Sequence, residues 1–221
     1  MMRPDGTEYE KDFAKLYHEY LEHLDTHLAN EIRNGYWLFF WLMALKPEKL
    51  LEIGAGSGKA CVIAKRLLPR SFVVASDVDP KVCEVIKEIA KRSEVDIKVE
   101  CFNGFSVPYP NDYFCVCFSC GLVEHFPIEK IQKLVREHLR VAKYVIIEVP
   151  TAMWFVSNMY SRGDEVKLSK VEWLSLFNSV ARIEDFGTFG PFAEEYCIVV
   201  ILTKKEGVDY GKPNEVCESS K

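Results

Sequence analysis

A short segment near residue 50 joins an acidic side chain to three closely spaced glycines. It reads LLEIGAGSGKA from Leu50 to Ala60, and Glu52 stands two residues before Gly54. Glycine lets the backbone pass close beneath a ligand, where any Cβ would collide. The Glu52 carboxylate, at the end of an apolar run, could receive a cationic amine. The segment therefore predicts a binding site for a small, nucleotide-like ligand.

Two common nucleotide-binding motifs do not fit this segment. The dinucleotide motif G-x-G-x-x-G requires a third glycine where the chain has Lys59. The P-loop requires glycine at Ile53 and serine or threonine at Ala60, and neither is present. The glycine turn therefore belongs to a different class of nucleotide site.

A second acidic residue follows the next apolar run. Asp77 lies in the segment VVASDVDP, nineteen residues after Gly58. A carboxylate at the tip of a second strand can accept hydrogen bonds from both hydroxyls of an adenosine ribose. In an open α/β sheet the ligand binds at the carboxyl ends of the strands, so we expect Glu52 and Asp77 to face one crevice.

The elements that must position these residues alternate along the chain. Continuous apolar runs predict the strands Lys49–Ile53, Ser71–Ser76, Asp96–Cys101, Tyr113–Ser119 and Tyr144–Val149. Helices are predicted between most of them, at Lys59–Leu68, Pro80–Lys91 and Ile128–Leu139. Runs buried on both faces and separated by helices favour a parallel sheet between two helical layers.

The N-terminal part reads as a helical lid, residues 1–46. Asp12–Arg33 has the apolar spacing of one amphipathic helix, with a stop at Asn34-Gly35. Tyr36–Leu45 is apolar on every side, so we expect a buried helix.

The regular alternation of predicted strands and helices ends at Pro150. Residues 151–178 read as an insertion on the acceptor side, with helices at Met153–Tyr160 and Lys170–Phe177. Val180–Phe186 and Tyr196–Thr203 then predict an antiparallel hairpin. We predict one domain, residues 1–203 with its core at 47–203, and a disordered polar tail at 204–221.

Composition limits the possible functions. The 221 residues are 48% hydrophobic and carry a net charge of -5, which makes a nucleic-acid partner unlikely. No signal peptide is evident, and the longest apolar stretch is too short to span a membrane, so we expect a soluble, cytoplasmic protein without membrane insertion. The eight cysteines mostly lie in apolar patterns, where free cysteine behaves as a small hydrophobe.

Four motifs in order and the hairpin ending resemble the class I S-adenosylmethionine-dependent methyltransferases over Lys49 to Thr203. The motifs are LLEIGAGSGK, VVASDVDP, NGFSVPYPNDYF and CFSCGLVEHF. The variant with Glu-His after the fourth strand is similar to the ubiquinone and menaquinone biosynthesis enzymes. The resemblance implies a Rossmann-like, three-layer α/β sandwich whose seven-stranded, mostly parallel sheet ends in an antiparallel strand.

The resemblance also implies roles at the cofactor. Glu52 would lie near the methionine end, Asp77 would bind the ribose, and Val78 would pack on the adenine. The amide oxygen of Asn103 could bind the adenine, and Ser119 and its neighbours would flank the methionine. The full set implied is Glu52, Gly54, Ala55, Gly56, Gly58, Asp77, Val78, Asn103, Gly104, Ser119 and Cys120. The family's aspartate on strand four is replaced, because the chain reads Phe114-Cys115-Val116-Cys117.

The methyl acceptor is predicted from aromatic residues around the expected lid and insertion. They form ordinary hydrophobic core or, taken together, a covered pocket suited to a small acceptor. The candidate acceptor-site residues are Tyr17, Tyr36, Glu124, Trp154, Asn158 and Tyr160.

Three further groups of residues each have a functional interpretation and a purely structural one. His125 is the candidate general base, or it packs the loop before Pro127. Glu19, His23 and His27 share a helix face with metal-compatible spacing, or form a solvated polar face. Cys120 matches the place of a metalloid-binding cysteine in arsenite methyltransferases, without recognisable partner thiols. We therefore predict no metal site.

The sequence thus predicts an enzyme that transfers a methyl group from S-adenosylmethionine to a small-molecule acceptor, leaving S-adenosylhomocysteine. A protein or RNA methyltransferase is one alternative. A non-catalytic S-adenosylmethionine-binding module is the other. The oligomeric state is not predicted.

Overall fold

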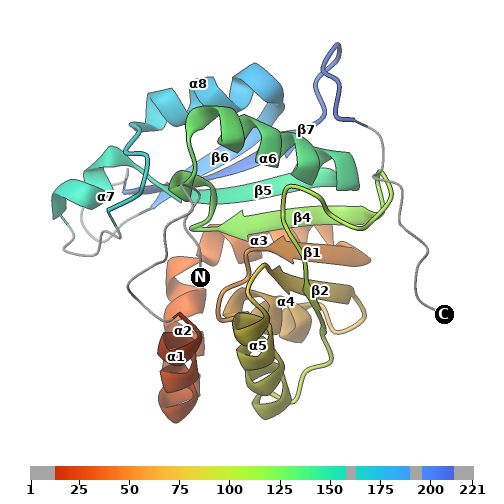
Figure 1. Ribbon diagram of the computed structural model, residues 1–221, viewed down its shortest axis with the longest axis vertical. Coiled ribbons are helices and arrows are strands. Elements are labelled where there is room, and N and C mark those ends of the chain that lie inside the picture. The colour runs from red at the N-terminus through yellow and green to blue at the C-terminus, as the bar shows by residue number, and fades with distance from the viewer. Residues whose placement is uncertain (1–12, 158–162, 190–195, 212–221) are drawn as a thin grey trace.

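A computed structural model describes residues 13–157, 163–189 and 196–211. One seven-stranded sheet runs through the protein in the order β3-β2-β1-β4-β5-β7-β6 (Figure 1). The strands are β1 (Lys49–Ile53), β2 (Phe72–Asp77), β3 (Lys98–Cys101), β4 (Phe114–Cys120), β5 (Ala142–Pro150), β6 (Arg182–Phe189) and β7 (Cys197–Thr203). The first five pair in parallel, and β7 is antiparallel to both β5 and β6. The predicted fold class and the closing hairpin are confirmed.

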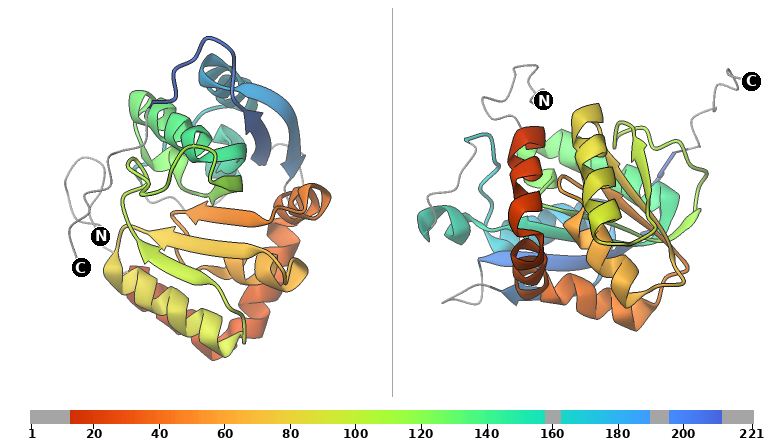
Figure 2. Two further views of the ribbon diagram at one scale, coloured as in Figure 1. Left: turned by 90° about the vertical axis from the view of Figure 1, so that its right-hand side faces the viewer. Right: turned by 90° about the horizontal axis from the view of Figure 1, so that it is seen from below.

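Helices cover both faces of the sheet (Figures 1 and 2). The helical segments before β4 are α1 (Phe13–Glu19), η1 (Tyr20–His23), α2 (Leu24–Asn34), α3 (Tyr36–Leu45), α4 (Lys59–Leu67) and α5 (Pro80–Arg92). Those after β4 are η2 (Val123–His125), α6 (Ile128–Val141), α7 (Ala152–Ser157) and α8 (Lys170–Val180). Segments α1 to α5 pack on one face, and α6 and α8 pack on the other.

The alternation of strand side chains produces the two cores. On β1, Leu50 belongs to the core under α1 to α5, while Leu51 belongs to the core under α6 and α8. Neighbouring residues on β7 divide in the same way. Because successive strand side chains point to opposite faces, a strand covered on both sides must be apolar throughout. This explains why the continuous apolar runs predicted the sheet correctly.

The predicted N-terminal helix is broken into three pieces. Asp12–Arg33 was expected to be one helix, but η1 separates α1 from α2, and His23 leaves the helical region with φ −132° and ψ 44°. A change from α to 3-10 geometry alters the direction in which the side chains of one turn point. The break lies at Tyr20, which reaches the binding cavities described below. In Figure 2, α1 runs beside α5.

Helix α3 is not buried on every side, so this prediction was wrong. Leu38, Phe39 and Leu42 are buried, but Phe40 is 55% exposed and Tyr36 and Met43 are also exposed. The outward face of α3 remains apolar although it faces solvent. The apolar composition of Tyr36–Leu45 therefore predicted more burial of this helix than the structure shows.

The polar tail is structured over its first part. The Tyr210 hydroxyl accepts a hydrogen bond from Lys205 N at 2.7 Å and donates one to Val180 O at 3.0 Å. The expectation of disorder from residue 204 is therefore wrong for residues 204–211. Residues 212–221 lie outside the described part of the chain.

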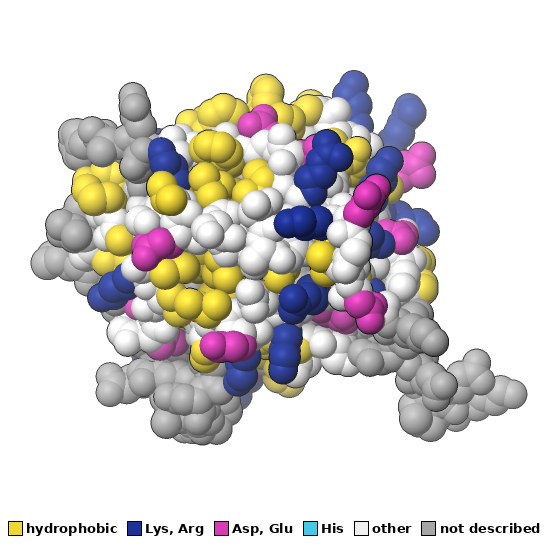
Figure 3. All heavy atoms as spheres, turned by 90° about the horizontal axis from the view of Figure 1, so that it is seen from above, with side chains coloured by type: hydrophobic (Ala, Val, Ile, Leu, Met, Phe, Trp, Pro, Cys, Tyr) yellow, Lys and Arg dark blue, Asp and Glu magenta, His cyan; other side chains and the backbone are white. Residues whose placement is uncertain are grey.

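The surface gives two further facts. None of the described helices is long and apolar enough to cross a lipid bilayer. On the face shown in Figure 3, lysine and arginine side chains lie among aspartates and glutamates. This face therefore lacks the broad basic surface that nucleic-acid binding favours.

Candidate cofactor and acceptor sites

A first cavity of about 500 Å³ opens at the carboxyl ends of β1, β2 and β4. Its walls come from the glycine turn after β1, the tip of β2, the loop after β3 and the N-terminal helices. Among the predicted cofactor residues it is lined by Glu52, Gly54, Ala55, Gly56, Asp77, Val78, Asn103, Gly104 and Cys120. The structure thus brings together residues from three predicted strand ends, as expected for an open α/β sheet.

The three glycines of the turn all have positive φ, between 54° and 71°. A Cβ on Gly54 would lie 2.7 Å from Leu122 Cδ1, and one on Gly56 would lie 3.0 Å from Tyr17 Oη. These glycines are therefore required by the backbone conformation and by the side chains that pack against the turn. From the sequence we had assigned these glycines to ligand clearance alone.

Gly58 and Ser119 do not line the first cavity. A Cβ on Gly58 would lie 2.6 Å from Ile86 Cγ2, so this glycine permits α4 to approach α5. Ser119 is fully buried in β4, and its Oγ has no hydrogen-bond partner among the described residues. Their positions give both residues a packing role, whereas we had predicted direct contact with the cofactor.

Glu52 provides a buried carboxylate in the wall of the first cavity. It is 3% exposed, and its Oε2 has no hydrogen-bond partner among the described residues. Burial raises the pKa of Glu52 to about 8. A cationic ammonium group would supply the missing partner and favour the ionised form. The amine of a methionine moiety fits this requirement.

Asp77 is held in place by the backbone that surrounds it. Its Oδ2 accepts from Gly56 N at 3.1 Å, and its Oδ1 accepts from Asp79 N at 3.0 Å. Each carboxylate oxygen has a second lone pair, so the group can still accept from a ligand. The neighbouring Val78 is 58% exposed, and its apolar side chain lines the same cavity. This arrangement fits the ribose and adenine of the expected cofactor.

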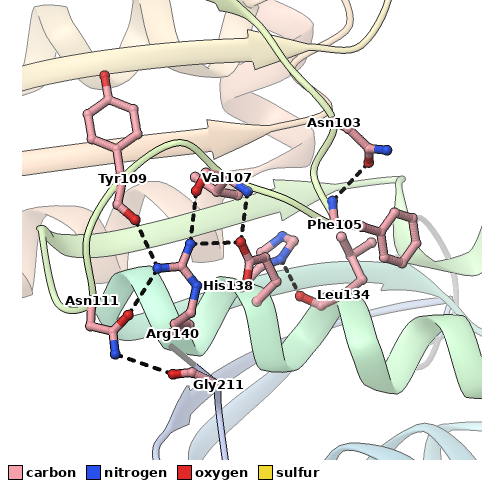
Figure 4. Close-up of polar contacts among 10 residues, drawn as sticks. Asn103, Phe105, Val107, Tyr109, Asn111, Leu134, His138, Arg140 and Gly211 are labelled. Atoms are coloured by element: carbon pink, nitrogen blue, oxygen red, sulfur yellow. Dashed lines mark hydrogen bonds and ion pairs between the residues drawn. The ribbon is translucent and has the colours of Figure 1, made fainter. Parts of the chain in front are cut away.

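Asn103 differs from the prediction in the atom it can offer. Its Oδ1 accepts a hydrogen bond from Phe105 N at 3.0 Å, and its amide nitrogen points away from this contact (Figure 4). We had assigned the amide oxygen to the adenine, but that oxygen already closes a turn within the loop. The amide nitrogen is the group that can donate to a ligand.

Three further residues that line the first cavity were not among the predicted site residues. Glu31 on α2 lies 3.2 Å from Lys59 Nζ, and Lys59 Nζ lies 4.7 Å from the centroid of the Tyr20 ring. All three line the first cavity. Glu31 lies on the polar side of an amphipathic helix, where a binding residue and a solvated one have the same pattern.

A second cavity of about 650 Å³ adjoins the first. Tyr20, Gly121 and His125 line both cavities. The remaining walls of the second cavity are aromatic, aliphatic and acidic: Phe13, Leu16, Glu124, Glu148, Val149, Pro150, Trp154, Phe155, Glu165 and Cys197. The predicted acceptor residues Glu124 and Trp154 lie here.

The other predicted acceptor residues are placed elsewhere. Tyr17 lines the first cavity. Tyr36 lines neither cavity, because it packs against Trp37 and Phe189 at the outer face of α3. Asn158 and Tyr160 lie outside the described residues.

His125 is buried where the two cavities meet. Its Nδ1 lies 3.0 Å from Asp164 Oδ1, and its Nε2 lies 3.9 Å from Glu124 Oε1. Its side chain is 8% exposed. A carboxylate at one ring nitrogen fixes the ring orientation. The contact with Asp164 could not be predicted from the sequence, because Asp164 lies 39 positions after His125 in the chain.

Two candidates from the sequence, His27 for a metal and Cys120 for a metalloid, lie in different surroundings. His27 stacks on Tyr20 with ring centroids 4.1 Å apart, which places it in an aromatic contact. Burial raises the pKa of the Cys120 thiol well above its ordinary value, so the neutral thiol is favoured. The seven cysteines of the described residues are all free.

Comparisons with known proteins agree with this arrangement. Residues 50–144 match a family described as a methyltransferase domain. The ribosomal protein L11 methyltransferase of Thermotoga neapolitana is 35% identical over 63 residues, which are 28% of this chain and 24% of that protein. The chain thus spans about a quarter of the length of this curated relative.

Solved structures share the fold at low sequence identity. The PH0226 protein of Pyrococcus horikoshii is 14% identical with a TM-score of 0.68, covering 80% of this chain and 91% of that one. Magnesium protoporphyrin IX methyltransferase of Synechocystis, solved with bound SAH, is 12% identical with a TM-score of 0.62, covering 88% and 100%. A SAM-dependent methyltransferase of Aquifex aeolicus is 16% identical with a TM-score of 0.60, covering 72% and 82%.

Proposed function

From the premise that the chain is a class I S-adenosylmethionine-dependent methyltransferase, we propose that its acceptor is a small molecule bound in the second cavity. The observation that carries this proposal is the junction between the two cavities. Tyr20, Gly121 and His125 line both, so a ligand in the second cavity would adjoin a cofactor in the first. Catalysis of methyl transfer depends on holding donor and acceptor in this kind of proximity.

The residues of the first cavity would hold the cofactor by three kinds of contact. The Glu52 carboxylate binds the ammonium group, Asp77 accepts from the ribose hydroxyls, and Val78 packs on the adenine. S-adenosylmethionine supplies an electrophilic methyl group when bound. The protein contributes orientation and exclusion of water, and it requires no covalent nucleophile.

The walls of the second cavity favour a small, partly apolar acceptor. Trp154 and Phe155 from α7 line this cavity together with Phe13 and Leu16 from α1. Aromatic walls with a few convergent polar groups are typical of small-molecule sites. His125, oriented by Asp164, stands at the junction, where an acceptor can lose its proton.

Occupancy of the first cavity gives a direct pH-linked prediction. Glu52, with a pKa of about 8 in the free protein, is mostly protonated at neutral pH. An ammonium beside it lowers that pKa, so binding of S-adenosylhomocysteine at pH 7 should release close to one proton. Affinity should accordingly rise as the pH increases toward about 8. Calorimetry in two buffers of different ionisation enthalpy measures the release, and Glu52→Gln should abolish it.

The acceptor class is tested by following radiolabelled methyl groups from S-adenosylmethionine. The purified protein is incubated with the small-molecule, protein and RNA fractions of one cell extract. We expect label in the small-molecule fraction, loss of this transfer in Trp154→Ala, and its retention in Tyr36→Ala, because Tyr36 lines neither cavity. Label confined to protein or RNA would favour the macromolecular alternative. Binding of S-adenosylhomocysteine without any transfer would favour the non-catalytic one.

A further inference from the structure

We propose that His125, Asp164 and Glu165 form a binding site for a divalent ion of the first transition row, such as Mn²⁺ or Zn²⁺. One ligand atom from each of the three side chains lies within 4.8 Å of the others. Cation binding itself does not depend on the proposed acceptor. Its use in methyl transfer rests on the proposed function, because the second cavity must then hold the acceptor.

The distances suit coordination of one ion. Ligand atoms at about 2.1 Å from a single metal lie roughly 3 to 4 Å apart. His125 Nδ1 and Asp164 Oδ1 are separated by 3.0 Å, which is the spacing of adjacent ligands on one ion. Glu165 follows Asp164 directly in the chain, and one of its carboxylate oxygens lies within 4.8 Å of the other two ligand atoms.

The two segments that carry these ligands are fixed to each other. Val166 N donates a hydrogen bond to Glu124 O at 2.7 Å, joining the segment after α7 to η2. His125 is the next residue on one side of this bond, and Glu165 is the next on the other. The backbone therefore holds the ligands together, and little ordering remains to be done when the ion binds.

The donor set and its surroundings indicate the class of ion. One imidazole with two carboxylates suits first-row transition ions better than Ca²⁺ or Mg²⁺, which prefer oxygen ligands alone. Glu124 adds a third carboxylate, with Oε1 3.9 Å from His125 Nε2. A divalent cation at this point offsets the negative charge that these groups bring together.

The position of the site gives the ion a task. Three protein ligands leave further coordination positions for water or substrate. His125 and Glu165 line the second cavity, so those positions face the acceptor. A bound cation would orient an acceptor oxygen and lower its pKa, which favours attack on a methyl group. The site thus favours an acceptor with a metal-binding oxygen, such as a hydroxyl group.

Metal binding by the full chain, without cofactor or acceptor, tests the proposal. Manganese binding is followed by electron paramagnetic resonance and zinc binding by calorimetry. We expect one ion per chain and enhanced relaxation of water protons by bound Mn²⁺. Glu165→Gln and Asp164→Asn should each weaken binding by at least about tenfold. Glu129→Gln, an exposed acid at the start of α6, is the matched control and should bind as the parent does.

The same variants distinguish a metal site from a role of His125 as a general base without metal. Glu165→Gln leaves the contact between His125 and Asp164 in place. A base alone therefore predicts that Glu165→Gln keeps parental activity at every concentration of added metal. Absence of saturable binding, or equal binding by parent, Glu165→Gln and Asp164→Asn, would overturn the metal site. Because S-adenosylhomocysteine affinity and methyl transfer are measured separately, failure of the proposed function would be seen independently.

Discussion

Asp77→Ala should weaken S-adenosylhomocysteine binding by about a hundredfold, because it removes the proposed acceptor of both ribose hydroxyls. Hydrogen bonds to a charged group contribute roughly 1.5 to 3 kcal/mol each, and about 3 kcal/mol corresponds to two orders of magnitude in affinity. Asp77 also accepts from Gly56 N and Asp79 N, so its loss loosens the glycine turn as well. Calorimetric titration measures the change.

Two further variants make the interpretation specific. Asp77→Asn keeps one carbonyl oxygen and should lose less affinity than Asp77→Ala. Asp96→Ala removes an exposed carboxylate from the segment before β3 and should bind as the parent does. If Asp77→Ala binds within threefold of the parent, the ribose assignment is wrong. Measuring thermal unfolding of each variant excludes general loss of the fold as the cause.

The part of the site that the sequence predicted is the part built from contiguous segments at strand ends. Glu52 and Gly54 follow from one turn, and Asp77 from the next strand. In a parallel sheet every strand delivers its last residue to the same edge. Local motifs therefore carry three-dimensional information here, and the prediction of the fold was correct.

The acceptor side was predicted less well because its geometry depends on distant segments. Tyr20 enters both cavities through a break in what reads as one continuous helix. Asp164 meets His125 across 39 residues of chain. Neither contact leaves a pattern in the spacing of the residues. Tyr36 shows the opposite error, because this aromatic residue of the expected lid packs on the outside of α3.

A buried arginine, Arg140, anchors the loop after β3, which lines the first cavity. It is 1% exposed and donates to Val107 O at 2.9 Å and to Tyr109 O at 2.8 Å (Figure 4). It also pairs with Glu137 on its own helix, and Glu137 accepts from Val107 N. Phe102 to Phe105, earlier in the same loop, line the first cavity. Arg140 is therefore a positioning residue for the cofactor site.

Arg140→Met should lower the free energy of unfolding by about 3 to 5 kcal/mol, the range for breaking a buried ion pair by removing one partner. For a chain of this size the midpoint of thermal unfolding should fall by about 10 °C. The remaining folded protein should bind S-adenosylhomocysteine more weakly, because the loop loses its anchor. Arg136→Met, on the same helix, is the control, since the bonds to Val107 O and Tyr109 O come from Arg140 and not from Arg136.

The source of the loss is identified by a second substitution at Glu137. In Arg140→Met the Glu137 carboxylate, which is 12% exposed, keeps its charge without its partner. Adding Glu137→Gln removes that charge, so the double variant should recover part of the lost stability. The weakened cofactor affinity should not recover, because the bonds to Val107 O and Tyr109 O stay absent. The single variant Arg140→Lys should also show weakened cofactor affinity, since an ammonium cannot reproduce the planar donor pattern of the guanidinium. Recovery of both properties in the double variant would show that Arg140 only neutralises a charge and does not position the loop.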